Sequence, residues 1–133
     1  IVFCGYGEPM LRLDVIKSVA ADVKQKGGKV RIDTNGHGNL IHKRNILPEL
    51  KGLVDAVSVS LNGQNAEIYE KLSQPKFANA YDAVKEFIKE ATKYIPEVTA
   101  TVVSAPGVDV EACRKIAEDL GAKYRVREYN VVG

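Results

Sequence analysis

Three short polar turns carry the residue types that could do chemistry in this chain. They are Gly5-Tyr6-Gly7-Glu8-Pro9, Asp33-Thr34-Asn35-Gly36 and Ser58-Val59-Ser60-Leu61-Asn62-Gly63, and each one ends an apolar run. Glycines let the backbone approach a ligand closely, a carboxylate can bind an ammonium group, and amides and hydroxyls can hold a carboxylate or a sugar. Together the turns predict a site for a small zwitterion that carries an ammonium group, a carboxylate and ribose hydroxyls.

Each turn taken alone also has a purely structural explanation. The Gly-Glu-Pro segment could be a strand-to-helix turn with a solvated acid, and Asn-Gly is a common turn dipeptide. Buried serines can simply bond to the neighbouring backbone. The case for a site rests on the recurrence of the turns after three successive strands, because the carboxyl ends of parallel strands meet at one edge of a sheet.

Other reactive side chains are sparse. Cys4 and Cys113 stand far apart in the sequence, so they form neither a disulfide framework nor a metal-ligand cluster, and we expect both to be small buried hydrophobes. His37 and His42 have no third ligand at zinc spacing, so we expect surface or capping histidines rather than metal ligands. The chain has no nucleophile elbow and no phosphate loop of the Gly-x-x-x-x-Gly-Lys type.

The elements that must position the turns alternate between strand and helix. Strands are predicted at 1–5, 29–34, 56–61, 98–103 and 123–129. Helices are predicted at 11–26, 39–51 (with a break near Pro48), 65–72 and 77–94, and after Asp109 as far as Gly121. Asp14 is the predicted N-cap of the first helix, and Gly27-Gly28 its end. The alternation predicts an all-parallel sheet with right-handed crossovers.

The strands have one apolar and one polar face. Ser58, Ser60 and Asn62 share a face of the third strand, whereas the central strands of a doubly wound sheet should be almost continuously apolar. The pattern favours an α/β fold with a wet, ligand-lined interior, and five βα units make only part of a barrel, since eight need ~250 residues. We therefore predict a partial (β/α) barrel that occupies residues 1–133 as a single domain.

Composition agrees with a soluble protein and points to no macromolecular partner. The chain has 133 residues, 45% of them hydrophobic, and a formal net charge of +2. This charge is too small to indicate nucleic acid or an anionic membrane, and no stretch approaches the ~20 apolar residues of a membrane span. We expect a cytoplasmic protein.

The three turns, in this order, resemble the core of the radical S-adenosylmethionine (radical SAM) superfamily. Tyr6-Gly7-Glu8-Pro9 resembles the family's Gly-Gly-Glu-Pro motif, with Tyr6 in place of the first glycine, and Thr34-Asn35-Gly36 matches its Thr-Asn-Gly motif. Asp33 matches an acid that reaches the amino group of the cofactor in activating-enzyme relatives. The longer string from Phe3 to Pro9 is similar to the TatD-associated radical SAM proteins.

The resemblance implies a cofactor, a site and a reaction. In the family, a 4Fe-4S cluster receives an electron from a donor and cleaves S-adenosylmethionine to a 5′-deoxyadenosyl radical; the substrate here would be a small molecule or a peptide. Gly7, Glu8 and Asp33 would hold the ammonium group, and Ser60 and Asn62 the carboxylate and ribose. The implied cofactor site consists of Gly7, Glu8, Pro9, Asp33, Asn35, Ser60 and Asn62. Arg127 could also face it, although an interior salt bridge is an equal alternative.

One departure from the family is large. Its Cys-x-x-x-Cys-x-x-Cys loop does not occur in these residues, so no metal ligand is assigned in this chain. We therefore expect a fragment, units two to six of a six-unit partial barrel, that is inactive alone. Its first strand would have a bare edge that could form a homodimer. Two alternatives are another βα-barrel enzyme, which would bind phosphate or a sugar near Gly36 or Gly63, and a non-catalytic binding module.

Overall fold

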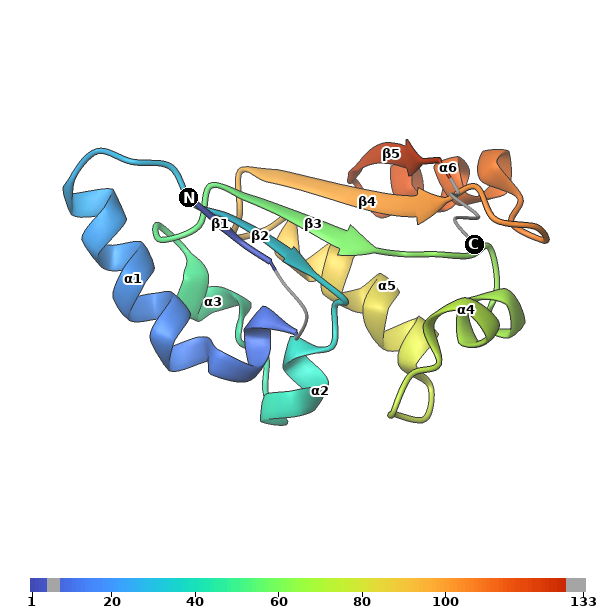
Figure 1. Ribbon diagram of the computed structural model, residues 1–133, viewed down its shortest axis with the longest axis horizontal. Helices are drawn as coiled ribbons and strands as arrows, with labels where there is room; N and C mark the ends of the chain where they lie inside the picture. The colour runs from blue at the N-terminus through green and yellow to red at the C-terminus, as the bar shows by residue number, and fades with distance from the viewer. Residues whose placement is uncertain (5–7, 129–133) are drawn as a thin grey trace, which may run out of the picture.

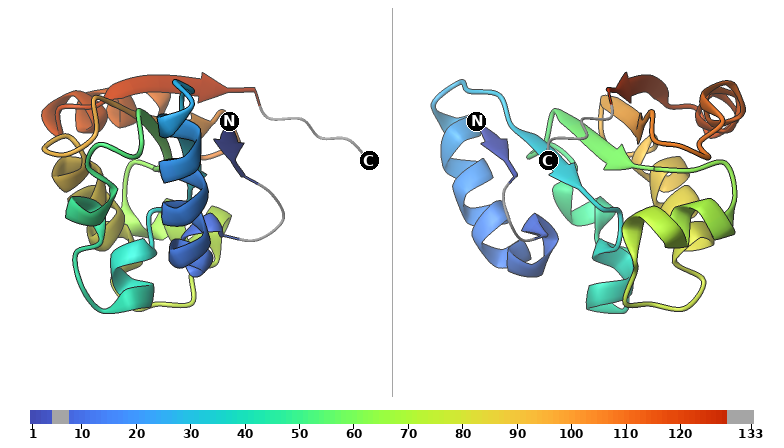
Figure 2. Two further views of the ribbon diagram at one scale, coloured as in Figure 1. Left: turned by 90° about the vertical axis from the view of Figure 1, so that its left-hand side faces the viewer. Right: turned by 45° about the vertical axis from the view of Figure 1, so that its right-hand side comes forward.

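The sheet contains five parallel strands and confirms the predicted partial (β/α) barrel. The computed structural model describes residues 1–4 and 8–128. Its strands are β1 (Val2–Phe3), β2 (Arg31–Thr34), β3 (Ala56–Ser60), β4 (Glu97–Val103) and β5 (Lys123–Arg127), and they lie side by side in sequence order. Figures 1 and 2 show the strands along one side of the molecule and helices α1, α3 and α5 along the other. Ligands of such sheets bind beyond the carboxyl ends of the strands.

The helices follow the predicted order, with shifted ends. They are the 3-10 helix η1 (Pro9–Arg12), α1 (Leu13–Gln25), α2 (Gly38–His42), α3 (Leu47–Leu50), α4 (Ala66–Ser73), α5 (Ala80–Ala91) and α6 (Val110–Asp119). The predicted segment 39–51 is therefore two short helices, and Pro48 lies in the first turn of the second.

Two predicted helix caps have different outcomes. Asp109 is confirmed, because its carboxylate accepts a hydrogen bond from the Ala112 N–H at 3.0 Å. Asp14 is wrong, because it lies inside the first turn of α1. Pro9 begins a helical turn earlier than expected, and the N-cap of that turn is Glu8. The predicted end of α1 is confirmed at Gly27, whose φ is +78°.

Alternation along the strands separates a buried face from an open face. Val57 and Val59 of β3 are fully buried against the helices, where Phe87 of α5 also lies. The intervening Ser58 and Ser60 are half-buried on the opposite face. Tyr81 and Phe87 belong to the core, as predicted. The apolar face thus anchors the sheet and leaves the polar face to line a site.

Two surface features complete the description. Ile1 and Val2 are exposed at the β1 edge of the sheet, and a homodimer through this edge stays a prediction. Among the described helices, none combines the length and apolar composition that crossing a membrane requires.

Candidate functional site

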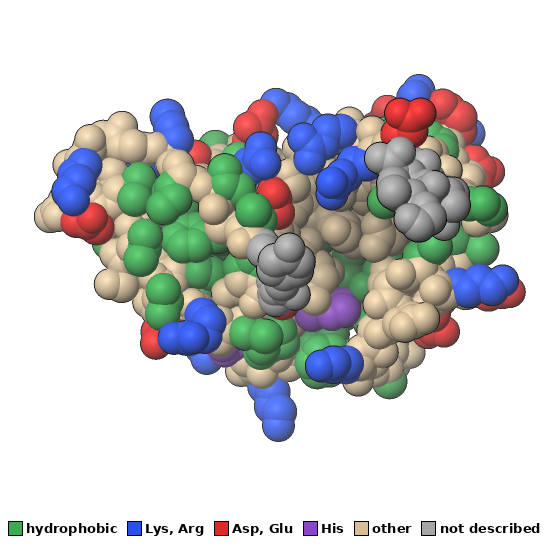
Figure 3. Space-filling model, in the orientation of Figure 1, with side chains coloured by type: hydrophobic (Ala, Val, Ile, Leu, Met, Phe, Trp, Pro, Cys, Tyr) green, Lys and Arg blue, Asp and Glu red, His purple; other side chains and the backbone are tan. Residues whose placement is uncertain are grey.

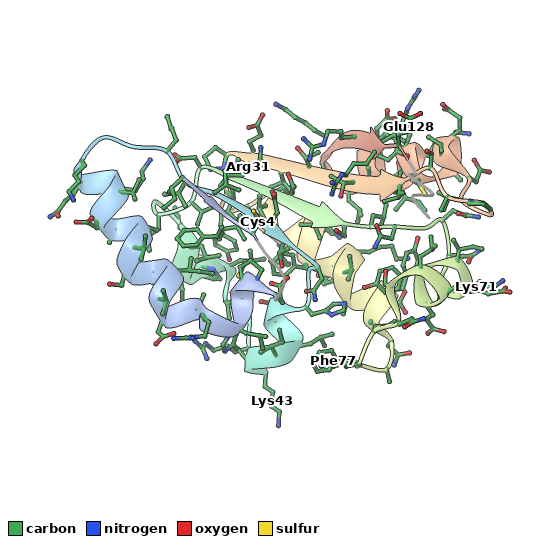
Figure 4. All side chains as sticks on the ribbon, in the orientation of Figure 1. Cys4, Arg31, Lys43, Lys71, Phe77 and Glu128 are labelled. Carbon is green, nitrogen blue, oxygen red and sulfur yellow. The ribbon has the colours of Figure 1, made fainter. Side chains whose placement is uncertain are left out.

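A cavity of about 490 Å³ lies on the open face, at the carboxyl ends of the strands. This volume is within the ~300–1,000 Å³ typical of small-molecule sites. Every strand or the turn after it contributes to the lining: Cys4, Glu8, Pro9, Asp33, Thr34, Asn35, Ser58, Ser60, Thr101, Arg125 and Arg127. In Figure 4, Cys4 lies beside the sheet near its centre, whereas Lys43 and Phe77 lie on the helical side.

Glu8 ties the first turn to the second. Its Oε1 accepts a hydrogen bond from the Asn35 N–H at 2.8 Å, and its Oε2 accepts bonds from the Thr34 hydroxyl at 2.6 Å and the Met10 N–H at 3.0 Å. These bonds use most of the acceptor capacity of one carboxylate. The structure thus shows Glu8 as a brace between the two turns; its predicted contact with an ammonium group stays a prediction.

Asp33 has a carboxylate oxygen without a hydrogen bond. Its Oδ1 is shielded from solvent and accepts no hydrogen bond from any described residue. Arg31 Nε lies 3.2 Å away, an ion-pair distance, but without hydrogen-bond alignment, and Arg31 Nη2 donates a long bond of 3.4 Å to Oδ2. We therefore regard the pair as an electrostatic contact. About a third of the Asp33 side chain stays exposed, so a ligand can reach a carboxylate whose hydrogen bonding within the chain is incomplete.

The parallel register places further polar groups in a row across the open face. Ser60 pairs with Thr101 in β4, and Thr101 pairs with Arg125 in β5. Asp33 in β2 pairs with Ser58 in β3, two residues before Ser60 along that strand. The row thus runs from acidic groups at β1 and β2, through hydroxyls, to guanidinium groups at β5.

The structure brings together five of the seven predicted cofactor residues. Glu8, Pro9, Asp33, Asn35 and Ser60 all line the cavity. Gly7 lies outside the described residues.

The seventh predicted cofactor residue, Asn62, lies next to the cavity and does not line it. Its Nδ2 donates a hydrogen bond to Ser73 Oγ at 2.9 Å. Its backbone is left-handed, with a φ of +62°, so its side chain leaves the line of the strand. A role in binding the cofactor stays a prediction for both Gly7 and Asn62.

Sequence reasoning missed three lining residues. Cys4 is exposed and lines the cavity, so its predicted burial is wrong; the apolar run that suggested burial ends at β1 before the cysteine. Cys113 is buried as predicted, and burial raises the pKa of its thiol to about 11. Thr101 and Arg125 were also missed, although the alternation of their strands places them on the face of Ser60.

The two histidines have structural contacts. His37 is buried, so a surface position is wrong, but it occupies the N-cap position of α2, which agrees with the alternative of a capping residue. Its Nε2 lies 2.7 Å from the Tyr69 hydroxyl. Burial lowers the pKa of His37, while the charge of Glu8 acts in the opposite direction. His42 Nε2 lies 2.7 Å from the Met10 carbonyl oxygen. No group of three or more His, Cys, Asp or Glu side chains in residues 1–4 and 8–128 could hold a metal ion.

Comparisons with known proteins agree on the family and the fold. The model of the Radical SAM superfamily matches residues 1–120. The uncharacterized protein MJ0804 of Methanocaldococcus jannaschii is 31% identical over 116 residues, which are 86% of this chain and 38% of that protein. This chain therefore spans well under half the length of that curated relative.

A solved structure is similar in fold. A domain of the pyruvate-formate lyase-activating enzyme from Bacteroides vulgatus ATCC 8482 superposes with a TM-score of 0.55 and 14% identity, over 96% of this chain and 98% of that domain. At this identity the likeness concerns the fold alone.

Proposed function

The chain belongs to the radical SAM superfamily, and from this premise we propose that its cavity binds the amino-acid end of S-adenosylmethionine. The observation that carries the proposal is the Asp33 carboxylate, which lines the cavity, is about one-third exposed, and has in Oδ1 an oxygen that faces Arg31 but forms no hydrogen bond with a described residue. An ammonium group offers three donors and a positive charge, so it matches this oxygen in both hydrogen bonding and charge.

The neighbouring groups suit the rest of the methionyl and ribose parts. Ser58 and Ser60 stand on the adjacent strand and offer hydroxyls to a carboxylate or to ribose oxygens. We assign Asn62 and the backbone at Gly7 to the same cofactor, as the family resemblance implies. Glu8 contributes mainly by fixing the second turn, on which Asp33 and Asn35 stand.

The activity of the whole protein is part of the proposal. In this superfamily a 4Fe-4S cluster supplies the electron that cleaves S-adenosylmethionine, and the products are methionine and a 5′-deoxyadenosyl radical. The two cysteines of this chain cannot supply the three thiolates of such a cluster. We therefore propose that these residues bind and orient the cofactor, and that they do not catalyse its cleavage on their own.

The phosphate-binding alternative is less well supported by the second turn. The Gly36 N–H, which a bound phosphate would need, already donates a hydrogen bond to Thr34 Oγ1 at 3.1 Å. Gly36 also packs closely on Val59 and Val84, so little space remains for a ligand at that position.

Equilibrium dialysis with S-adenosylmethionine tests the proposal. We expect wild-type protein to bind the cofactor and Asp33→Asn to weaken binding about tenfold or more, because a charge-assisted hydrogen bond contributes ~1.5–3 kcal/mol. Asp82→Asn is the matched control, since Asp82 is 80% exposed on α5, outside the cavity. Absence of binding to the wild type, or equal affinity of Asp33→Asn and the wild type, would refute the proposal.

A further inference from the structure

The β5 end of the cavity has a positive charge that the proposed cofactor does not use. Arg125 and Arg127 are exposed and line the cavity, and their guanidinium groups form no ion pair or hydrogen bond with any residue that the structure describes. Other basic residues on this face are already paired: Arg31 with Asp33, and Lys123 with Glu97 at 2.6 Å. Figure 3 shows Lys and Arg side chains gathered over β4 and β5 on the side of the molecule in view.

The distance across the sheet separates the acidic and basic ends of the cavity. Asp33 is on β2 and Arg125 on β5, so three strand spacings of about 4.8 Å, or about 14 Å along the sheet, lie between their backbones. The ammonium and carboxylate of S-adenosylmethionine are attached to one carbon atom. With the ammonium at Asp33, the carboxylate lies beside Ser58 and Ser60 on β3, well before β5.

Charge balance leads to the same conclusion. S-adenosylmethionine carries a sulfonium, an ammonium and a carboxylate, so it brings a net positive charge into the cavity. It would complement the carboxylates of Glu8 and Asp33, and it would bring no anion beyond its own carboxylate to the two guanidinium groups. Guanidinium groups present rigid forked donors that match carboxylate and phosphate oxygens, and the Thr101 hydroxyl lies next to Arg125 in the register.

We propose that Arg125 and Arg127 bind a carboxylate or phosphate group of the substrate that shares the cavity with S-adenosylmethionine. The inference rests on the proposed function, because it assigns the acidic end of the cavity to the cofactor. It defines the substrate class as an anion, and it makes the two arginines specificity-determining residues.

Anion binding to the full-length protein, saturated with S-adenosylmethionine, tests the inference. Succinate and inorganic phosphate serve as probes of the two oxyanion types, and the arginine Nε–H signals report on binding by NMR. We expect at least one probe to shift the signals of Arg125 and Arg127. In the double variant Arg125→Gln/Arg127→Gln, the affinity of the protein for that probe should fall about tenfold or more, while its affinity for S-adenosylmethionine changes less than about twofold.

Two further variants keep the result interpretable. Arg114→Gln removes an exposed arginine of α6 that lies outside the cavity and pairs with Glu111 at 3.1 Å, and it should leave anion binding unchanged. Arg125→Lys/Arg127→Lys retains the charge without the forked donors and should bind the probe with intermediate affinity. If the glutamine variant fails to fold, the wild-type NMR titration and the lysine variant still decide the question.

The outcomes separate this inference from the proposed function. A tenfold loss of S-adenosylmethionine affinity in the arginine variant would overturn the inference, because the arginines would then hold the cofactor carboxylate. Equal anion affinity in wild type and variant would also overturn it and would indicate an adventitious ion only. Failure of the wild type to bind S-adenosylmethionine refutes the proposed function instead, and the arginine dependence of anion binding is then read in the cofactor-free protein.

Discussion

Replacement of Glu8 by alanine should cost this fold about 3 kcal/mol of unfolding free energy. The side chain accepts three hydrogen bonds, from the Asn35 N–H, the Thr34 hydroxyl and the Met10 N–H. Each such bond contributes about 1 kcal/mol net, with allowance for water that replaces it at a half-buried site. The loss is large for a domain whose total stability is ~5–15 kcal/mol.

Urea unfolding at neutral pH measures this effect. At ~1–3 kcal/mol per molar urea, the midpoint of Glu8→Ala should fall by about 1–3 M with an unchanged slope. Glu8→Gln should lose less, about 1–2 kcal/mol, because one oxygen remains as an acceptor. Glu86→Gln is the matched control, since Glu86 is exposed on α5.

Asp33→Asn provides the contrast that distinguishes a brace from a ligand-binding acid. The Asp33 ion pair with Arg31 is about one-third exposed on the carboxylate side, so its loss should cost less than about 1 kcal/mol. We expect Glu8 variants to lose stability and Asp33→Asn to lose cofactor affinity. Wild-type stability in Glu8→Ala would refute the brace and leave its carboxylate free for a ligand.

Three further predictions follow from separate features. Gly36→Ala should destabilise the protein about 1–3 kcal/mol more than Gly27→Ala in urea unfolding. Both glycines have φ near +80°, but a Cβ at Gly36 would meet Val59 at 2.9 Å, whereas a Cβ at Gly27 would meet open space. Equal losses in the two variants would contradict this packing argument. Hydrogen bonds from Arg44 and then Lys17 lower the pKa of Glu49 from 4.5 to about 2. The stabilisation that ionised Glu49 gives the fold is therefore complete above pH 4.5 and is lost as the pH falls toward 2. The difference in unfolding free energy between wild type and Glu49→Gln should shrink over that window, and a constant difference would contradict the prediction. Iodoacetamide should modify exposed Cys4 in the native protein and reach buried Cys113 only after unfolding. S-adenosylmethionine should slow the modification of Cys4, because Cys4 lines the cavity in which we propose that the cofactor binds. Mass spectrometry of the labelled peptides measures both effects.

The sheet and the shared position of the turns were predictable because they depend on local pattern and one topological rule. Alternation along β3 placed Val57 and Val59 on the buried face and Ser58 and Ser60 on the open one. Because the carboxyl ends of parallel strands lie at one edge of a sheet, the turns that follow them are predicted to lie close together. The same reasoning would have found Thr101 if it had been applied to β4.

The errors arose where tertiary contacts outweigh local pattern. The partners of Glu8 lie 26 and 27 residues away in the sequence, and no local signal specifies them. His37 appeared as a polar loop residue, yet Tyr69 and Phe77 enclose it. Cys4 continues an apolar run but lies beyond the end of β1, where the cavity begins.

The two acids of the cavity have different partners, although both stand at adjacent strand ends. Glu8 reaches across to the backbone and hydroxyl of the second turn, and both of its oxygens are occupied by this chain. Asp33 is held from one side by Arg31, stays about one-third exposed, and has one oxygen that forms no hydrogen bond with a described residue. Residue type alone assigned both acids to the same ammonium group. We therefore expect Glu8 to fix the second turn and Asp33 to bind the ammonium group, since an acceptor already satisfied by the protein gains little from a ligand, while an incompletely satisfied one gains more.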